Sequence, residues 1–341
     1  MAALIPWTAV STLPASRSWP VVFATSPAYY SQHYLFVIGG WDGSANTRTV
    51  YSASVNSTTG ALGSWRTNTT NWSGALNYGA GGILYSSPYG WNTLVTVGGG
   101  QHNNVSTGGA QPMWASIDLS TGNIANVGTT PNASLSRLGM GFAQYDSSRF
   151  FATGGYIWSG STRQHVTATL LYDMVNGATN LVGSGTALPE GRYGHGMFIR
   201  GGNLYVIGGW TASGNTDLSI IYAPINGSSP YLGAWSTLGN IPNYCVGRTC
   251  VMSDLPNQRR AIWYAYGTTL YRGNFADPAN SAVSSITWNS YSNGFPFGFY
   301  DDSNLVLVAN RFLFAVNGST VYMADLNKIP NAPPALQLSG F

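Results

Sequence analysis

Four arginines stand at equivalent points of the chain, each at the entrance to an expected inner strand, and they are the first candidates for chemistry. They are Arg17, Arg137, Arg192 and Arg248. Guanidinium groups that converge on one point bind carboxylates through paired hydrogen bonds, so this set could capture an anion. The simpler interpretation is hydrogen bonding to neighbouring loops, encoded once in each repeat.

A second group of candidates combines aromatic, amide and acidic side chains that follow pairs of glycines. Flat aromatic faces stack on the C–H faces of sugar rings, and amides and carboxylates pair with sugar hydroxyls. The same surface would suit a protein partner. The predicted ligand-binding residues, in addition to the four arginines, are Trp41, Asp42, Gln101, His102, Tyr156, Trp158 and Trp210. For Trp41 and Trp210 the alternative is that they only cover the edge of a repeated unit.

The elements that must position these residues recur at intervals of 54 to 59 residues in four clear copies, and two weaker copies follow at about the same period. Apolar runs that end in glycine occur at LFVIGG, LVTVGGG, FFATGG and LYVIGG, with weaker copies at IWYAYG and FLFAVNG. A second run with an aromatic residue follows each one, which is typical of a strand. A glycine-rich or aromatic apolar run precedes each glycine pair, and Trp65, Trp235 or Trp288 marks a further strand in three units. The pattern therefore predicts four strands per unit.

Six such units predict an all-β fold: a six-bladed β-propeller of four-stranded antiparallel blades. The sixth unit ends at TVYMADLNKIP without a fourth strand, and the N-terminal PWTAVSTLPASR resembles GAWSTLGNIP of the fourth unit. We therefore expect residues 1–16 to supply the closing outer strand of the last blade, which removes free sheet edges. Residues 1–330 would form one domain, and the proline-rich residues 331–341 an extended tail.

The order hydrophobic-Gly-Gly, then Tyr, then Trp, then LP-x-x-R resembles the kelch repeat over nearly the whole chain. The fifth and sixth units lack the Gly-Gly pair, and the second lacks the arginine and the tryptophan. The resemblance implies that the loop after the second strand and the connection into the next inner strand share one face. It also implies that the arginines could read acidic peptides. The loops are long in the first four units, so blades one to four would carry function.

Catalysis by known enzymes of this superfamily would need residues that the chain does not group together. A copper radical oxidase resembling galactose oxidase requires two histidines and a Cys-linked tyrosine on one face, but His33, His102, His165 and His195 are scattered. The motifs of sialidase-like propellers are missing. A kelch-type sugar epimerase could use Glu190 with an arginine and His195, because proton abstraction needs only a tuned carboxylate. We expect no enzyme activity, no cofactor and no metal, and we keep the sugar-processing enzyme as an alternative.

The amino-acid composition limits which partners the protein could bind and where it could be located. Charged residues make up 7% of the chain and the net charge is +3, without a Lys/Arg block for a phosphate backbone, so nucleic acid is not an expected partner. No apolar run is long enough for membrane insertion. The charge-poor, Ser/Thr/Asn-rich composition is typical of an extracellular, cell-surface or virion-surface protein, although no signal peptide is visible.

Seven sequons and two cysteines are candidates for covalent modification. The glycosylation candidates are Asn56, Asn68, Asn71, Asn104, Asn132, Asn226 and Asn317. We expect Asn56, Asn68, Asn71 and Asn226 to lie in surface loops. Cys245 and Cys250 could form a local disulfide or remain two buried thiols.

Together these features predict a recognition or adhesion module that binds glycan or glycoprotein through the long loops of blades one to four. The principal alternative is a structural surface or coat protein whose loops and C-terminal tail contact neighbouring subunits. An intracellular kelch adaptor is a third class, for which we would expect an additional assembly domain.

Overall fold

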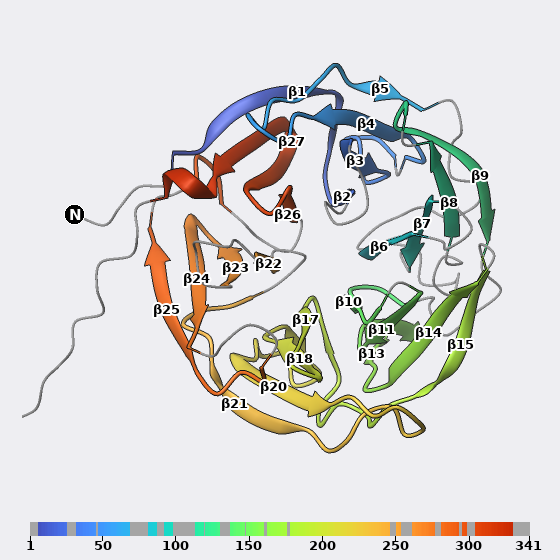
Figure 1. Ribbon diagram of the computed structural model, residues 1–341, viewed down its shortest axis with the longest axis vertical. Helices are drawn as coiled ribbons and strands as arrows, with labels where there is room; N and C mark the ends of the chain where they lie inside the picture. Colours follow the sequence, from blue (N-terminus) through green and yellow to red (C-terminus); the bar gives the residue numbers. More distant parts are fainter. Residues whose placement is uncertain are drawn as a thin grey trace, which may run out of the picture.

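The computed structural model describes residues 6–25, 32–45, 47–68, 81–86, 92–97, 113–118, 120–129, 137–146, 148–159, 162–175, 178–245, 250–253, 261–276, 281–292, 295–298 and 304–329. Strands arranged as radial sheets around a central axis make up the fold (Figure 1). A short 3-10 helix, η2 (Leu326–Lys328), follows the last strand. No helix among these residues is long and apolar enough to cross a membrane.

Five of the sheets are four-stranded and antiparallel, and we call them the first to fifth blades. The first is β2 (Val21–Ala24), β3 (His33–Ile38), β4 (Val50–Val55) and β5 (Arg66–Thr67). The second is β6 (Gly81–Ser86), β7 (Asn92–Val97), β8 (Met113–Asp118) and β9 (Asn123–Thr129). The third is β10 (Gly141–Gln144), β11 (Arg149–Thr153), β14 (Thr169–Val175) and β15 (Ala178–Ser184).

The fourth blade is β17 (Gly196–Arg200), β18 (Asn203–Ile207), β20 (Ser219–Pro224) and β21 (Ser236–Asn240). The fifth is β22 (Val251–Ser253), β23 (Ala261–Tyr266), β24 (Thr269–Phe275) and β25 (Ile286–Tyr291). Two small antiparallel pairs stand outside the blades: β12 (Tyr156–Ser159) with β13 (Thr162–His165), and β16 (Arg192–Tyr193) with β19 (Trp210–Thr211).

The remaining sheet, the closing sheet, corrects the predicted number of blades. It has three strands in the order β1-β27-β26, so the structure has five four-stranded blades and not six. The strands are β1 (Thr8–Arg17), β26 (Asn304–Val308) and β27 (Phe312–Asp325). The count differs because β27 is a single element that pairs with β26 through its first half and with β1 through its second half. The predicted closure by an N-terminal strand is confirmed, since Ala9 pairs with Tyr322.

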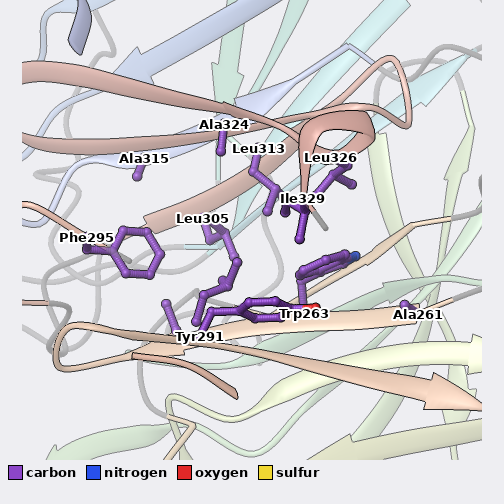
Figure 2. Packing of buried hydrophobic residues seen from close by; sticks show 12 residues of the cluster. Ala261, Trp263, Tyr291, Phe295, Leu305, Leu313, Ala315, Ala324, Leu326 and Ile329 are labelled. Carbon is purple, nitrogen blue, oxygen red and sulfur yellow. The ribbon is translucent and has the colours of Figure 1, made fainter. Parts of the chain in front are cut away.

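The innermost strands form a closed ring around the axis (Figure 1). They contact one another in the cyclic order β2, β6, β10, β17, β22, β26 and back to β2. The core lies between neighbouring sheets. At one such interface the fully buried Trp263 and Leu313 belong to a cluster that joins the fifth blade to the closing sheet (Figure 2). Truncation of Trp263 to alanine should cost about 3–5 kcal/mol of folding free energy.

Small residues in the inner strands let neighbouring blades approach closely, as the glycine-rich runs predicted. A Cβ added to Gly141 of β10 would lie 2.5 Å from the Nε2 atom of His195, which precedes the inner strand of the fourth blade. Only glycine fits there without displacing the imidazole. The predicted tail, residues 331–341, lies outside the described part of the chain.

Candidate functional site

One local construction recurs in the first, third and fourth blades. The segment that enters the inner strand pairs with the segment that follows the glycine pair of the same blade. The paired residues are Ser18 with Trp41, Leu138 with Tyr156, and Tyr193 with Trp210. In the first pair, each backbone N–H donates to the other residue's carbonyl at 2.8 Å. Both segments therefore lie on one face of the propeller, the entry face, as the resemblance to the kelch repeat implied.

The glycine pairs make this construction possible. Gly154 and Gly155 have φ angles of 60° and 84°, in the left-handed region that side chains disfavour. A Cβ at Gly154 would lie 2.4 Å from the carbonyl oxygen of Arg192. That carbonyl accepts a hydrogen bond of 2.8 Å from the Gly155 N–H, so the glycine pair of the third blade is tied to the entry segment of the fourth.

Three of the four predicted arginines lie in equivalent, buried places beside these glycines. Arg17, Arg137 and Arg192 are only 4%, 7% and 3% exposed. Arg137 and Arg192 each donate through Nη1 to the carbonyl of the first glycine in their own blade's pair, at 3.1 and 3.2 Å. Burial lowers the pKa of both guanidiniums. These contacts agree with the simpler interpretation, in which the arginines of the repeats hold neighbouring loops by hydrogen bonds. The binding of an anion by these arginines stays a prediction.

The other contacts of these arginines also lie within the fold. Arg192 forms an ion pair with Asp217, in which Nη2 and Oδ2 are 2.6 Å apart. Arg17 donates through Nη2 to the Tyr51 hydroxyl at 2.8 Å. Arg248 lies outside the described residues.

The predicted aromatic and acidic residues of the first blade lie at the surface of the entry face. The Trp41 side chain is 36% exposed. Asp42 is exposed, and its Oδ1 accepts hydrogen bonds from the backbone of Ala45 and from the backbone and hydroxyl of Ser44. These bonds lower the pKa of Asp42 to about 2. The carboxylate is therefore ionised and fixed in position at neutral pH.

The third blade carries a compact cluster of aromatic rings around a cation. The Arg163 guanidinium lies over the rings of Tyr156 and Tyr193, 4.6 and 5.1 Å from their centroids, and Nη1 donates to the Tyr193 hydroxyl at 2.8 Å. The two tyrosine rings meet edge to face with centroids 4.8 Å apart. The pair β12 and β13 brings His165 opposite Tyr156. Tyr156, predicted as a surface residue that binds ligand, is instead buried beneath this cluster.

Trp19 is a residue of this face that the sequence analysis missed. It follows the entry segment of the first blade with a φ of 52°, where the third and fourth blades have Gly139 and Gly194 with φ of 64° and 65°. Its half-buried side chain packs against Leu138 and Tyr156. The sequence contains a signal for this residue. When the units are aligned on their arginines, RSW of the first unit matches RLG and RYG of the third and fourth, so Trp19 stands where the other two units have glycine. We name five aromatic residues in and beside the paired segments the aromatic rim: Trp19, Trp41, Tyr156, Tyr193 and Trp210.

The remaining predicted ligand-binding residues are placed only in part. Trp210 is half-buried beside Tyr193. The backbone of Trp158 pairs with Arg163 in the hairpin. Gln101 and His102 lie outside the described residues.

His195, the predicted partner of Glu190 in an epimerase, lies between the third and fourth blades and not at the surface. It is 4% exposed, and its Nε2 is 2.7 Å from the Thr153 hydroxyl. Burial lowers the pKa of His195 to about 3, and the positive charge of Arg192 acts in the same direction. Glu190 itself is exposed. Within the described ranges, no group of three or more His, Cys, Asp or Glu residues could hold a metal ion.

The sequence left open whether the two cysteines form a disulfide or remain thiols. In the structure both are free thiols, with Cys245 buried and Cys250 half-buried. The prediction that Asn68 lies in a surface loop is wrong. Asn68 is 2% exposed, donates to the Val50 carbonyl and the Ser52 hydroxyl, and accepts from the Ile124 N–H.

The other sequons divide between exposed positions and the part of the chain that is not described. Asn56 and Asn317 are exposed and Asn226 is half-buried. Asn71, Asn104 and Asn132 lie outside the described residues.

Comparisons with known proteins agree with the fold. No family model matches the chain, and no curated protein matches its sequence. Among solved structures, one titled "Structure of YjhT" is similar with a TM-score of 0.56 and 13% sequence identity, over 92% of this chain and 95% of that chain. At this identity the likeness supports the fold alone, which is a β-propeller.

Proposed function

We propose that this protein is a non-catalytic recognition module that binds glycan or glycoprotein at the aromatic rim, on an extracellular, cell or virion surface. One observation carries the proposal. The same paired segments recur in three blades, and in two of them the residue after the glycine pair is a tryptophan with exposed surface, Trp41 or Trp210. The charged content of 7% supports the location, because such a surface changes little in charge with the medium.

The chemistry of the rim suits sugar rings. The exposed indole of Trp41 offers a flat apolar face for the C–H face of a pyranose. Beside it, the ionised Asp42 is held by its turn and can accept hydrogen bonds from sugar hydroxyls. Arg163, which lies over two tyrosine rings, adds a positive charge to the same face. The ligand would thus meet stacking surfaces together with groups that already have their orientation, which lowers the entropic cost of binding.

A glycan array tests the proposal with wild-type protein and the double variant Trp41→Ala, Trp210→Ala. We expect the wild type to bind a defined set of glycans and the variant to lose at least about tenfold in affinity, since central aromatic residues commonly contribute 1–2 kcal/mol or more. Leu181→Ala is the matched control, because Leu181 is an exposed apolar residue on the outer strand β15. Unchanged binding by the double variant would move the site elsewhere, and turnover of a bound sugar would favour the enzyme.

We also propose that the closing sheet is a sixth blade of kelch type. The Leu326 N–H donates to the Arg311 carbonyl at 2.9 Å, although these residues flank the two ends of β27. A straight strand of this length would span roughly 45 Å. The contact therefore supports a chain that folds back near Gly318, whose φ is 59°, and supplies two blade segments. A crystal structure in which β27 runs straight through Gly318 would refute this proposal.

A further inference from the structure

We infer that the indole of Trp19 lies across the mouth of the central channel and forms the stacking platform for a pyranose ring of the bound glycan. This inference deepens the proposed function and rests on it. It moves the centre of the site from the long loops to the axis of the propeller.

The backbone of Trp19 is in a conformation that a tryptophan adopts only under constraint. Its φ of 52° lies in the left-handed region, which is rare for a bulky residue and strained. The preceding residue, Ser18, is fixed by its two 2.8 Å hydrogen bonds to Trp41. Gly139 and Gly194 occupy the same place without strain. Strain of this kind persists where the surroundings hold it, and it is frequent at ligand-binding positions.

The contacts of Trp19 place its side chain over the channel. Trp19 lies two residues before the inner strand of the first blade, yet it packs against Leu138 and Tyr156 of the third blade. These two blades are not neighbours, because β6 of the second blade lies between β2 and β10 in the ring of inner strands. A side chain that joins them at the entry face must therefore extend across the interior of that ring.

The chemistry at this point favours a sugar over an acidic ligand. Arg17, Arg137 and Arg192 are buried, and each donates within the fold, to the Tyr51 hydroxyl or to a glycine carbonyl, while Arg192 also pairs with Asp217. The half-buried indole keeps part of its surface open while the rest packs. Trp41, whose backbone is paired with Ser18, adds a second exposed indole from the same blade. Two neighbouring indoles match the C–H faces of pyranose rings.

Trp19→Gly is the decisive variant, because it restores the residue of the equivalent positions and relieves the strained φ. We expect this variant to stay folded, with a melting temperature within about 4 °C of the wild type. Its affinity for a glycan that binds the wild type on the array should fall at least about tenfold. Leu181→Ala should bind like the wild type.

Trp19→Phe keeps a smaller aromatic ring and covers the case in which Trp19→Gly fails to fold. Its affinity should fall about threefold or more, and unchanged affinity would overturn the inference. If the wild type binds glycans and a folded Trp19→Gly variant binds them equally well, Trp19 is only a structural plug and the rest of the rim carries recognition. If the wild type binds no glycan, the proposed function itself fails, and the role of Trp19 fails with it.

Discussion

A change from pH 7 to pH 5 should lower the free energy of unfolding of the His195→Gln variant by about 2 kcal/mol less than it lowers that of the wild type. Burial and the charge of Arg192 lower the pKa of His195 from 6.5 to about 3. The folded state therefore keeps the imidazole neutral, whereas the unfolded chain protonates it below its ordinary pKa. Stability from this residue is fully present above pH 6.5 and is lost as the pH falls from 6.5 towards 3.

The magnitude follows from proton linkage. The slope of the unfolding free energy with pH is 2.303RT times the difference in bound protons between the unfolded and folded states. At pH 7 an unfolded histidine is about one-quarter protonated, and at pH 5 it is almost fully protonated. The folded state takes up almost no proton over this range, because the folded pKa is about 3. Integration gives about 2 kcal/mol of lost stability.

Urea unfolding at pH 7 and pH 5 tests this difference in wild type and variant. Glutamine is chosen because its amide can still bond to the Thr153 hydroxyl, which lies 2.7 Å from His195 Nε2. His33 and His165 also have lowered pKa values, but both remain in the variant, so the difference between the two proteins isolates His195. Equal losses of stability in the two proteins would mean that the folded state protonates His195, and the argument from burial would be refuted.

Three further outcomes are expected from single perturbations. Asp217→Ala should lower the urea unfolding free energy by about 3 kcal/mol, because the guanidinium beside it stays buried without its counter-ion; a loss under about 1 kcal/mol would contradict this. Oxidised glutathione should join Cys245 and Cys250, with release of two reduced glutathiones per bond; mass spectrometry that finds both thiols still alkylatable would rule this out. Folded protein secreted from eukaryotic cells should carry glycan on exposed Asn56 and none on buried Asn68, and peptide mapping distinguishes the two sites.

Local pattern was sufficient to predict the blades, because each is built from strands close together in the chain. The glycine pairs predicted where second strands end, and the N-terminal likeness to the fourth unit predicted the closing strand β1. The count of four-stranded blades failed in the region 312–325. There β27 is one element, and the two runs that the sequence predicted as a pair of strands are not separate strands.

The site was harder to predict, because contacts between blades decide which side chains reach the surface. Tyr156 follows its glycine pair just as Trp41 does, yet Arg163 and Tyr193 cover it from the hairpin and from the next blade. Asn68 looked like a loop residue, but the second blade's Ile124 N–H binds its side chain. A pattern that repeats within one blade contains no information about such partners.

The arginines and the residues of the aromatic rim belong to the same paired segments of the entry face. Arg192 accepts from Gly155 through its carbonyl and donates to Gly208 through its guanidinium, so one entry segment joins two blades. In the proposed function, recognition depends on the aromatic side chains, because the three described arginines are buried and donate within the fold. Glycan affinity should therefore change less than about twofold when NaCl rises from ~0.1 to ~0.5 M, since stacking is hardly screened. If isothermal titration calorimetry shows a steep loss of affinity with salt, the arginines contact the ligand and this reasoning is wrong.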